Sequence, residues 1–291
     1  MKRRRFIAVA AAFACAPRFV EAQSWQGQAL GANVSLTLNG PRSEISAALA
    51  ELSGWLETFE DTFSLYRSAS MLSRLNRDGR LSAPGGLFED LVQRVSAAHD
   101  VTDGLFDPTV QPLWDALAKG ENPGAARSLI GWDRVQSNVL GQIRMAPGQK
   151  LTFNGVAQGY ATDLVRDALH QRGFTKALIN IGEYAALGGP FRLGLSDPAF
   201  GMAGQVTLSG HAIATSSPGA LLLGGHGHIL GPQGQRPLWS TLSIEADSAA
   251  LADALSTAGV FMRLDRLRQL KRQAGLRRII AIDQQGNLRS I

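Results

Sequence analysis

The sequence predicts an α+β protein, a single compact unit in which helices flank a mixed, largely antiparallel sheet. Three observations support this prediction. Short apolar stretches typical of strands outnumber the amphipathic helices, and many of them follow one another with only a Gly- or Pro-containing turn between them. No repeat or low-complexity linker divides the chain. With 291 residues, 45% of them hydrophobic, the chain has enough material for a sizeable core.

The first half of the chain predicts a strand, two amphipathic helices and a hairpin. Apolar residues recur at helical spacing from Ile45 to Phe63 and again after Leu87. The expected order is a strand at 26–38, a helix capped by Ser43, a polar connection at 63–79 with a short helical turn, a second helix closed near Gly104, and a hairpin of 143–145 with 150–153 around the turn 146–149.

The second half predicts mostly strands. They are expected at 176–181, 191–195, 205–208, 211–215 and 239–245, with a segment 226–230 before a turn, a helix capped by Asp247 or Ser248 and running to about Phe261, a basic helix at 264–273, and a last strand at 278–282.

The stretch Leu151–Asp163 (LTFNGVAQGYATD) is the one around which the site is expected to form. A β-favouring run ends at Asn154-Gly155, two residues that tolerate positive φ, and a helix follows until Gly173. A strand, a glycine turn and a helix N-terminus together offer backbone N–H groups to an anion such as phosphate. Such turns also join strands to helices where no ligand binds, so this arrangement alone is a weak signal.

The N-terminal 22 residues predict an export signal, with a mature domain at 23–291. Residues 1–5 are charged, residues 6–16 form an apolar run too short to span a bilayer, and Val20-Glu21-Ala22 fits a cleavage site. The Arg3-Arg4-Arg5-Phe6 run also suits twin-arginine export instead of the general route. A lipid anchor at Cys15, the only cysteine, is less favoured because the preceding residues make a poor lipobox. We therefore expect a periplasmic protein with no transmembrane segment in the mature chain.

The position of the charges argues against nucleic acid as a partner. The first 22 residues supply five positive charges against one negative charge, so without them the formal net charge falls from +5 to +1. The high isoelectric point thus comes mostly from the targeting segment, and it gives no support for DNA or RNA binding.

Asp253 and Thr257 are the candidate metal ligands. They are four residues apart on a predicted helix, so their oxygens share one helical face. A hard cation such as Mg²⁺ takes such oxygens together with backbone carbonyls, water and substrate phosphates. The alternative is that Asp253 lies on a solvated face of the helix, and without further information this alternative is favoured.

His228 is the candidate general base. It follows a glycine-rich stretch and lies near a turn, whereas His99 and His170 lie on predicted helices. The sequence has no HExxH pair, GxSxG elbow, Walker loop or GxGxxG fingerprint, which argues against a zinc site and against the best-known nucleophile and nucleotide motifs.

Seven stretches in order resemble the ApbE family of FAD:protein FMN transferases. They span nearly the whole mature chain, and their order makes a specific signal although each is weak alone: residues 63–76, 102–114, 151–163, 177–183, 213–217, 228–237 and 252–258. The spelling of 154–160 with Gly182-Glu183 further resembles the NosX-like branch, which is linked to nitrous oxide reductase maturation.

The resemblance implies a Mg²⁺-dependent transfer of FMN from FAD to a threonine or serine hydroxyl of an acceptor protein, with release of AMP. The implied acceptor is a flavoprotein, expected to be a membrane-associated electron-transfer subunit. The implied metal site consists of Asp253, Thr257, Ser256 and a backbone carbonyl at Gly155, and His228 would accept the hydroxyl proton because imidazole has an ordinary pKa of about 6.5. The positions that match FAD contacts of the family are Tyr66, Leu105, Phe106, Asp107, Thr152, Gln158, Glu183 and Ile229.

The chain departs from the family pattern at several of these positions. The family usually has Asp at the place of Thr152 and commonly has Gly-Asp at the place of Glu183-Tyr184. Gln158 stands where the family frequently has lysine. The family also commonly has His-x-x-Asp-Pro, whereas this chain has Gly231 in place of the aspartate that comes three residues after His228. Loss of two acidic groups would weaken metal or FAD binding unless Glu183 restores one of them.

Two other functions remain open at this point. A degenerate member would bind flavin as a carrier or assembly factor without transferring it. An Mg²⁺-dependent FAD pyrophosphatase would use water as the nucleophile and produce FMN and AMP. Asp107 also has an alternative, since it could simply bond the local backbone in a turn.

Overall fold

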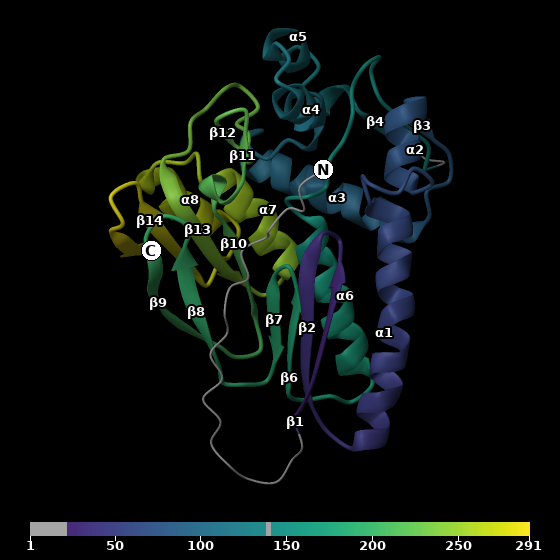
Figure 1. The fold of residues 1–291 in the computed structure, drawn as a ribbon, viewed down its shortest axis with the longest axis vertical. Helices are drawn as coiled ribbons and strands as arrows, with labels where there is room; N and C mark the ends of the chain where they lie inside the picture. The colour runs from purple at the N-terminus through teal and green to yellow at the C-terminus, as the bar shows by residue number, and fades with distance from the viewer. Residues whose placement is uncertain (1–21, 138–140) are drawn as a thin grey trace.

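The computed structural model describes residues 22–137 and 141–291 (Figure 1). The predicted signal peptide, including Cys15, lies outside these residues except for Ala22, so the division at residue 22 stays a prediction. Within the described ranges, no helix is long and apolar enough to cross a membrane.

An eight-stranded sheet forms the centre of the molecule. All of its neighbouring strands pair antiparallel. Its spatial order is β1 (Ala22–Ala29), β2 (Ala32–Asn39), β6 (Ala177–Ile181), β7 (Tyr184–Leu187), β10 (Ala212–Ser216), β13 (Trp239–Ala246), β14 (Arg278–Asp283) and β15 (Leu288–Ser290).

Three smaller sheets surround it. They are β3 (Arg80–Leu81), β5 (Ile143–Arg144) and β4 (Gln136–Ser137) in one sheet, the hairpin β8 (Phe191–Asp197) with β9 (Gly201–Leu208), and the short pair β11 (Leu222–Leu223) with β12 (His226–Gly227).

The α-helices are α1 (Arg42–Phe63), α2 (Met71–Asp78), α3 (Gly86–Val101), α4 (Gln111–Lys119), α5 (Pro123–Arg127), α6 (Ala157–Gln171), α7 (Ala249–Gly259) and α8 (Leu264–Gln273). Short 3₁₀ turns occupy Pro108–Val110, Trp132–Arg134 and Pro218–Ala220.

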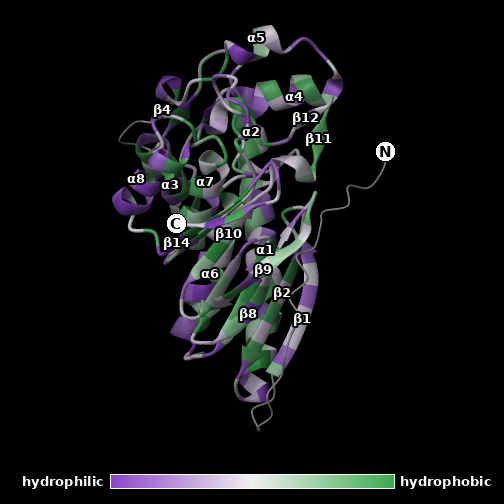
Figure 2. Ribbon diagram, turned by 90° about the vertical axis from the view of Figure 1, so that its left-hand side faces the viewer, coloured by the Kyte–Doolittle hydropathy of each residue, from purple (hydrophilic) through white to green (hydrophobic). Residues whose placement is uncertain are grey.

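The two faces of the large sheet belong to different hydrophobic cores. Along β6, Ala177, Ile179 and Ile181 pack into the main core with the helices, whereas Leu178 packs under the β8–β9 hairpin. Successive side chains of a strand point to opposite faces, so this alternation places the helices on one face and the hairpin on the other. Figure 2 shows the apolar β2 beside a more polar edge strand, β1. The predicted α+β class is thus confirmed.

Several predicted elements differ from the structure in detail. The predicted strand 26–38 is a hairpin, β1 and β2, that turns at Leu30-Gly31. The predicted pairing of 143–145 with 150–153 is wrong, because β5 pairs with β3 and β4 instead and 150–153 is irregular. Short strands are completed by tertiary partners that local propensity does not encode. Helix α1 begins at Arg42 after Pro41, without the predicted Ser43 cap.

Candidate functional site

Helix α7 carries three of the predicted site residues, and α6 holds its N-terminus. The Oγ of Ser248 caps α7 by accepting a hydrogen bond from the Leu251 N–H at 3.2 Å. Asp163 on α6 accepts from the Ala249 and Ala250 N–H groups at 2.8 and 3.0 Å and from the Ser248 hydroxyl at 2.6 Å. A carboxylate at a helix N-terminus satisfies otherwise unpaired N–H groups and interacts favourably with the helix dipole. Asp163 therefore fixes where α7 starts.

The two helices approach closely at Gly159. A Cβ added to Gly159 would lie 2.3 Å from the Ala249 carbonyl oxygen, so only glycine permits this contact. The Gly159 N–H donates to Oδ2 of Asp253 at 3.1 Å. Asp253 is 4% exposed, which excludes the solvated-face alternative.

Hydroxyl groups surround Asp253 on the same side of α7. The Ser256 hydroxyl donates to the Asp253 carbonyl at 3.0 Å and lies 2.8 Å from the Ser216 Oγ at the end of β10. The Ser216 Oγ also lies 3.4 Å from the Thr257 Oγ1. A Cβ added to Gly155 would come within 2.8 Å of that same Thr257 oxygen. The structure thus brings together the four predicted metal-site residues, Gly155, Asp253, Ser256 and Thr257.

The Asn154-Gly155 turn works differently from the prediction. Neither residue adopts a positive φ, so glycine is required here for the close approach to Thr257 and not for backbone conformation. The preceding residues 151–153 form no strand, and α6 starts at Ala157.

Glu183 is the second buried carboxylate of this region, at 8% exposure. Its Oε2 accepts from the Thr215 N–H at 3.0 Å, and its carbonyl accepts from the Thr162 hydroxyl at 3.1 Å. The neighbouring Gly182 lies against Gln158, since a Cβ there would be 2.5 Å from the Gln158 amide carbon. Gln158 and Glu183, predicted as FAD contacts, therefore lie beside the α6 turn that binds Asp253.

Burial controls the ionisation of both carboxyl groups. Loss of solvation raises the pKa of Asp253 from 3.8 to about 7, against the lowering effect of the Gly159 hydrogen bond. Burial and then the nearby charge of Asp253 raise the pKa of Glu183 well above its ordinary range, against the Thr215 hydrogen bond. Two buried acids of this kind, without an ion pair among the described residues, favour a bound cation.

The donor set fits a hard divalent cation such as Mg²⁺. Oxygen is the only ligand atom that Asp253, Ser256, Thr257 and the Gly155 carbonyl would offer, which is what Mg²⁺ prefers. No group of three or more His, Cys, Asp or Glu side chains with metal-site geometry occurs in the part of the chain described. The arrangement therefore suits a cation that also keeps water or substrate oxygens, and it does not suit a softer metal.

The segment 105–109 forms a second part of the site. Phe106 is buried, and Leu105 packs at the edge of the main core. Asp107 accepts from the Thr109 N–H at 2.8 Å and from the Trp132 N–H at 3.2 Å. The bond from Thr109 confirms that Asp107 bonds the local backbone, whereas the bond from Trp132 joins it to a distant segment. The contact of Asp107 with FAD stays a prediction. Thr152 joins this segment, because its N–H donates to the Pro108 carbonyl at 2.8 Å.

His228 lies on the loop that returns from β12. Its N–H donates to the Leu221 carbonyl at 3.0 Å, and its Nδ1 lies 3.3 Å from the Pro218 carbonyl oxygen. Pro218 follows Ser216 by two residues, so the imidazole contacts the segment that continues from Ser216, whose hydroxyl contacts Ser256 and Thr257. Its neighbour Ile229 packs against the main core. Tyr66 is 70% exposed, an unusual state for a large aromatic ring and one that suits contact with a ligand.

Sequence reasoning missed Ser216 and Asp163 as parts of this site. Both lie in stretches that carry the family resemblance, 213–217 and 151–163, so the signal was present. Their roles depend on contacts with α7, which is distant in the sequence.

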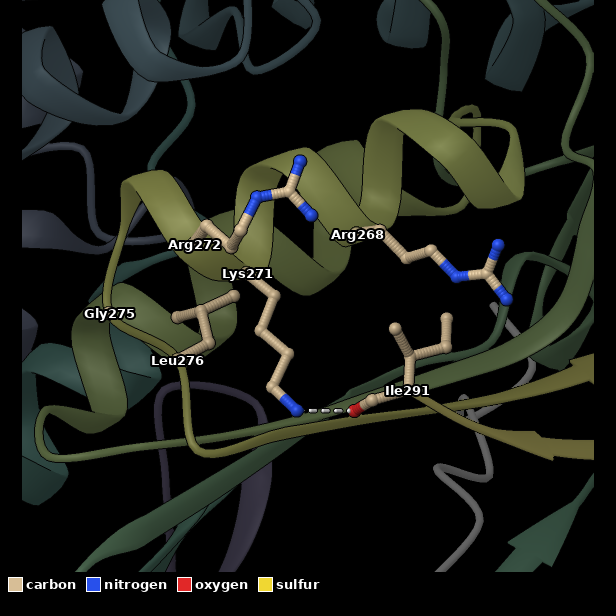
Figure 3. Close-up of a pocket in the computed structure, with 6 residues that line it drawn as sticks. All are labelled: Arg268, Lys271, Arg272, Gly275, Leu276 and Ile291. Atoms are coloured by element: carbon tan, nitrogen blue, oxygen red, sulfur yellow. Dashed lines mark hydrogen bonds between the residues drawn. The ribbon is translucent and has the colours of Figure 1, made fainter.

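A separate cavity of about 530 Å³ lies at α8 and the end of the chain (Figure 3). Its lining residues are Arg268, Lys271, Arg272, Gly275, Leu276 and Ile291, and the Lys271 ammonium donates to the Ile291 carbonyl oxygen at 2.9 Å. None of the predicted site residues lines this cavity, so it is not part of the candidate site.

Comparisons with known proteins found similar sequences. The sequence model of the ApbE family matches residues 30–280. An FAD:protein FMN transferase of Klebsiella pneumoniae is 28% identical over 236 residues, covering 74% of this chain and 73% of the relative. One from Escherichia coli K12 is 24% identical over 286 residues, covering 86% of this chain and 81% of the relative.

Solved structures show the same fold. The apo Pseudomonas stutzeri flavinyl transferase ApbE superposes with a TM-score of 0.78 at 25% identity, and the comparison covers 94% of both chains. The ApbE protein of Thermotoga maritima gives a TM-score of 0.82 at 22% identity, with 92% of this chain and 96% of that one covered.

Proposed function

This chain belongs to the ApbE family, and we propose that it is an FAD:protein FMN transferase that attaches FMN to a threonine or serine hydroxyl of an acceptor protein and releases AMP. The names of its relatives, at 24–28% identity in the two cases above, support the transferase class. The observation that carries the proposal is structural. Asp253 is buried one helical turn from Thr257, and the two residues contact Gly159 and Gly155, both in the stretch 151–163 that carries the family resemblance.

The transfer exchanges the phosphoanhydride bond of FAD for a phosphoester bond to the acceptor protein. The acceptor hydroxyl oxygen forms a bond to the FMN-side phosphorus of FAD, and the bond from that phosphorus to the AMP phosphate oxygen breaks, with its electron pair leaving on AMP. Such a reaction needs alignment and charge neutralisation more than covalent help from the enzyme. Bound at Asp253, Thr257, Ser256 and the Gly155 carbonyl, Mg²⁺ would supply the positive charge that stabilises the leaving phosphate.

The chain's own groups have separate tasks in this scheme. His228 accepts the proton of the attacking hydroxyl as a general base. The contact of the Ser216 hydroxyl with Ser256 and Thr257 orients their oxygens. The contacts proposed for FAD are Tyr66, Leu105, Phe106, Asp107, Thr152, Gln158, Glu183 and Ile229. Asp107 would act there by holding the 105–109 segment in place.

We further propose that the protein works in the periplasm on a membrane-associated electron-transfer flavoprotein, since the N-terminal 22 residues read as an export signal. A role in nitrous oxide reductase maturation stays a prediction, which rests on the NosX-like residues 154–160 together with Gly182-Glu183.

The experiment combines the purified protein with FAD, Mg²⁺ and a candidate acceptor domain. Flavin fluorescence that survives denaturing electrophoresis of the acceptor, with one AMP formed per flavin bound, would support the transferase. Flavin lost on denaturation without AMP would identify a carrier. Free FMN together with AMP would identify a pyrophosphatase. Either of the last two results would overturn the proposal.

A further inference from the structure

Glu183 is a buried acid in the turn between two strands of the large sheet. It lies between β6 and β7, 8% exposed, and makes no ion pair within the residues described. By contrast, Glu245, another buried glutamate, pairs with Arg278 and with His211. Burying a carboxylate without a positive partner costs folding free energy, so the burial of Glu183 suggests that a positive group binds it in the functional protein.

The surroundings of Glu183 connect it to both sides of the proposed metal site. On one side, its Oε2 accepts from the Thr215 N–H, and the next residue, Ser216, contacts Ser256 and Thr257. On the other side, its carbonyl accepts from Thr162 of α6, the helix whose Gly159 N–H binds Asp253. Glu183 is therefore bonded to α6 and to the end of β10, two elements that also contact the proposed metal ligands on α7.

Each carboxylate has one oxygen with a hydrogen bond from the described backbone and one without. Oδ2 of Asp253 and Oε2 of Glu183 have backbone donors, whereas Oδ1 of Asp253 and Oε1 of Glu183 accept no hydrogen bond from the described residues. No buried side-chain oxygen of the described residues lacks a hydrogen-bond partner, so these two unbonded oxygens must reach solvent, where a cation can bind them.

We propose that Glu183 is a second carboxylate ligand of the divalent cation held by Asp253 and Thr257. This inference rests on the proposed function, which places the cation there. Two carboxylates balance the double charge of the cation before any phosphate arrives, so the protein should bind the metal without FAD.

Metal binding without flavin tests the inference. Mn²⁺ serves as the probe, because electron paramagnetic resonance reports free Mn²⁺ directly and Mn²⁺ accepts the same oxygen ligands. The proteins compared are wild type, Glu183→Gln, and Glu245→Gln as a control that removes a buried glutamate with partners of its own. We expect Glu183→Gln to weaken Mn²⁺ binding by about 10- to 100-fold and Glu245→Gln to leave it unchanged.

Thermal unfolding with chelator separates a ligand from a structural acid. Glutamine has nearly the same shape as glutamate and removes a buried charge, so Glu183→Gln should unfold at the wild-type temperature or higher when no metal is present. Mn²⁺ affinity within about twofold of wild type in a folded Glu183→Gln variant would overturn the inference, since losing a ligand costs far more. A wild type that binds Mn²⁺ in this way yet forms no covalent flavin would instead overturn the proposed function and leave the ligand assignment intact.

Discussion

The backbone of Gly155 lies against the side chain of Thr257, so that a Cβ on Gly155 would come within 2.8 Å of the Thr257 Oγ1 and 3.1 Å of its Cγ2. Gly155 precedes α6, and Thr257 lies in the third turn of α7, 102 positions later in the chain. This contact leaves no room for a side chain at position 155 unless Thr257 moves.

Replacing Gly155 with alanine should therefore damage the site without unfolding the protein. The added methyl group would push Thr257 away, and a displacement near 1 Å in a catalytic site costs about 100-fold in rate. We expect Gly155→Ala to lower the rate of covalent flavin transfer by about that factor. Gly54→Ala is the matched control, because nothing lies within 4 Å of a Cβ at that helix position. Equal rates in the two variants would contradict the contact.

The folding stability of the metal-free protein should fall as the pH rises through neutrality. Burial raises the pKa of Asp253 from 3.8 to about 7, so the folded state binds more protons than the unfolded state between these values. Stability then decreases from about pH 4 to about pH 7. In chelator, Asp253→Asn should remove this contribution and unfold roughly 5 °C above wild type at pH 8, with a smaller difference at pH 5. Wild type and variant with parallel pH profiles would contradict the prediction.

Asp163 should stabilise the fold by holding the N-terminus of α7, the helix that carries Asp253 and Thr257. Its carboxylate accepts from Ala249, Ala250 and Ser248 while 5% exposed, so Asp163→Ala leaves the start of α7 uncapped. We expect the free energy of unfolding in urea to drop by about 3 kcal/mol. Asp167→Ala on the same helix removes an exposed acid and should cost under about 0.5 kcal/mol. A similar loss in both variants would refute the capping role.

His228→Ala should slow the transfer by about 100- to 10,000-fold while FAD binds as before, which is the range associated with a general base. The control is His226→Ala, an exposed histidine two residues earlier on the same hairpin. Single-turnover rates and flavin fluorescence titrations measure the two quantities separately. An unchanged rate for His228→Ala would mean that another group takes the proton.

Elements with strong local signals could be predicted from the sequence. Helix α8 runs over 264–273 as expected, and Ser248 caps α7 as one of the two predicted alternatives. The pairing of β5 with β3 and β4 could not be predicted, because strands of two residues gain their structure from partners far along the chain. The turn at Leu30-Gly31 was hidden by the loose alternation of 26–38.

The candidate site, too, could be predicted from the sequence only in part. Spacing placed Asp253 and Thr257 on one helical face, but it could not show that this face is buried against Gly159. Ser216 and Asp163 act through residues more than 35 positions away, so only the folded chain reveals their roles. Local chemistry was sufficient for Asp107, whose bond to the Thr109 N–H is a contact between near neighbours.

A crystal structure of the protein with FAD and Mg²⁺ tests the central proposal most directly. The account predicts a metal ion about 2.1 Å from oxygens of both Asp253 and Thr257 and in contact with the diphosphate of FAD. A complex in which the diphosphate binds elsewhere, with Asp253 still bonded to Gly159 and no metal beside it, would contradict the account.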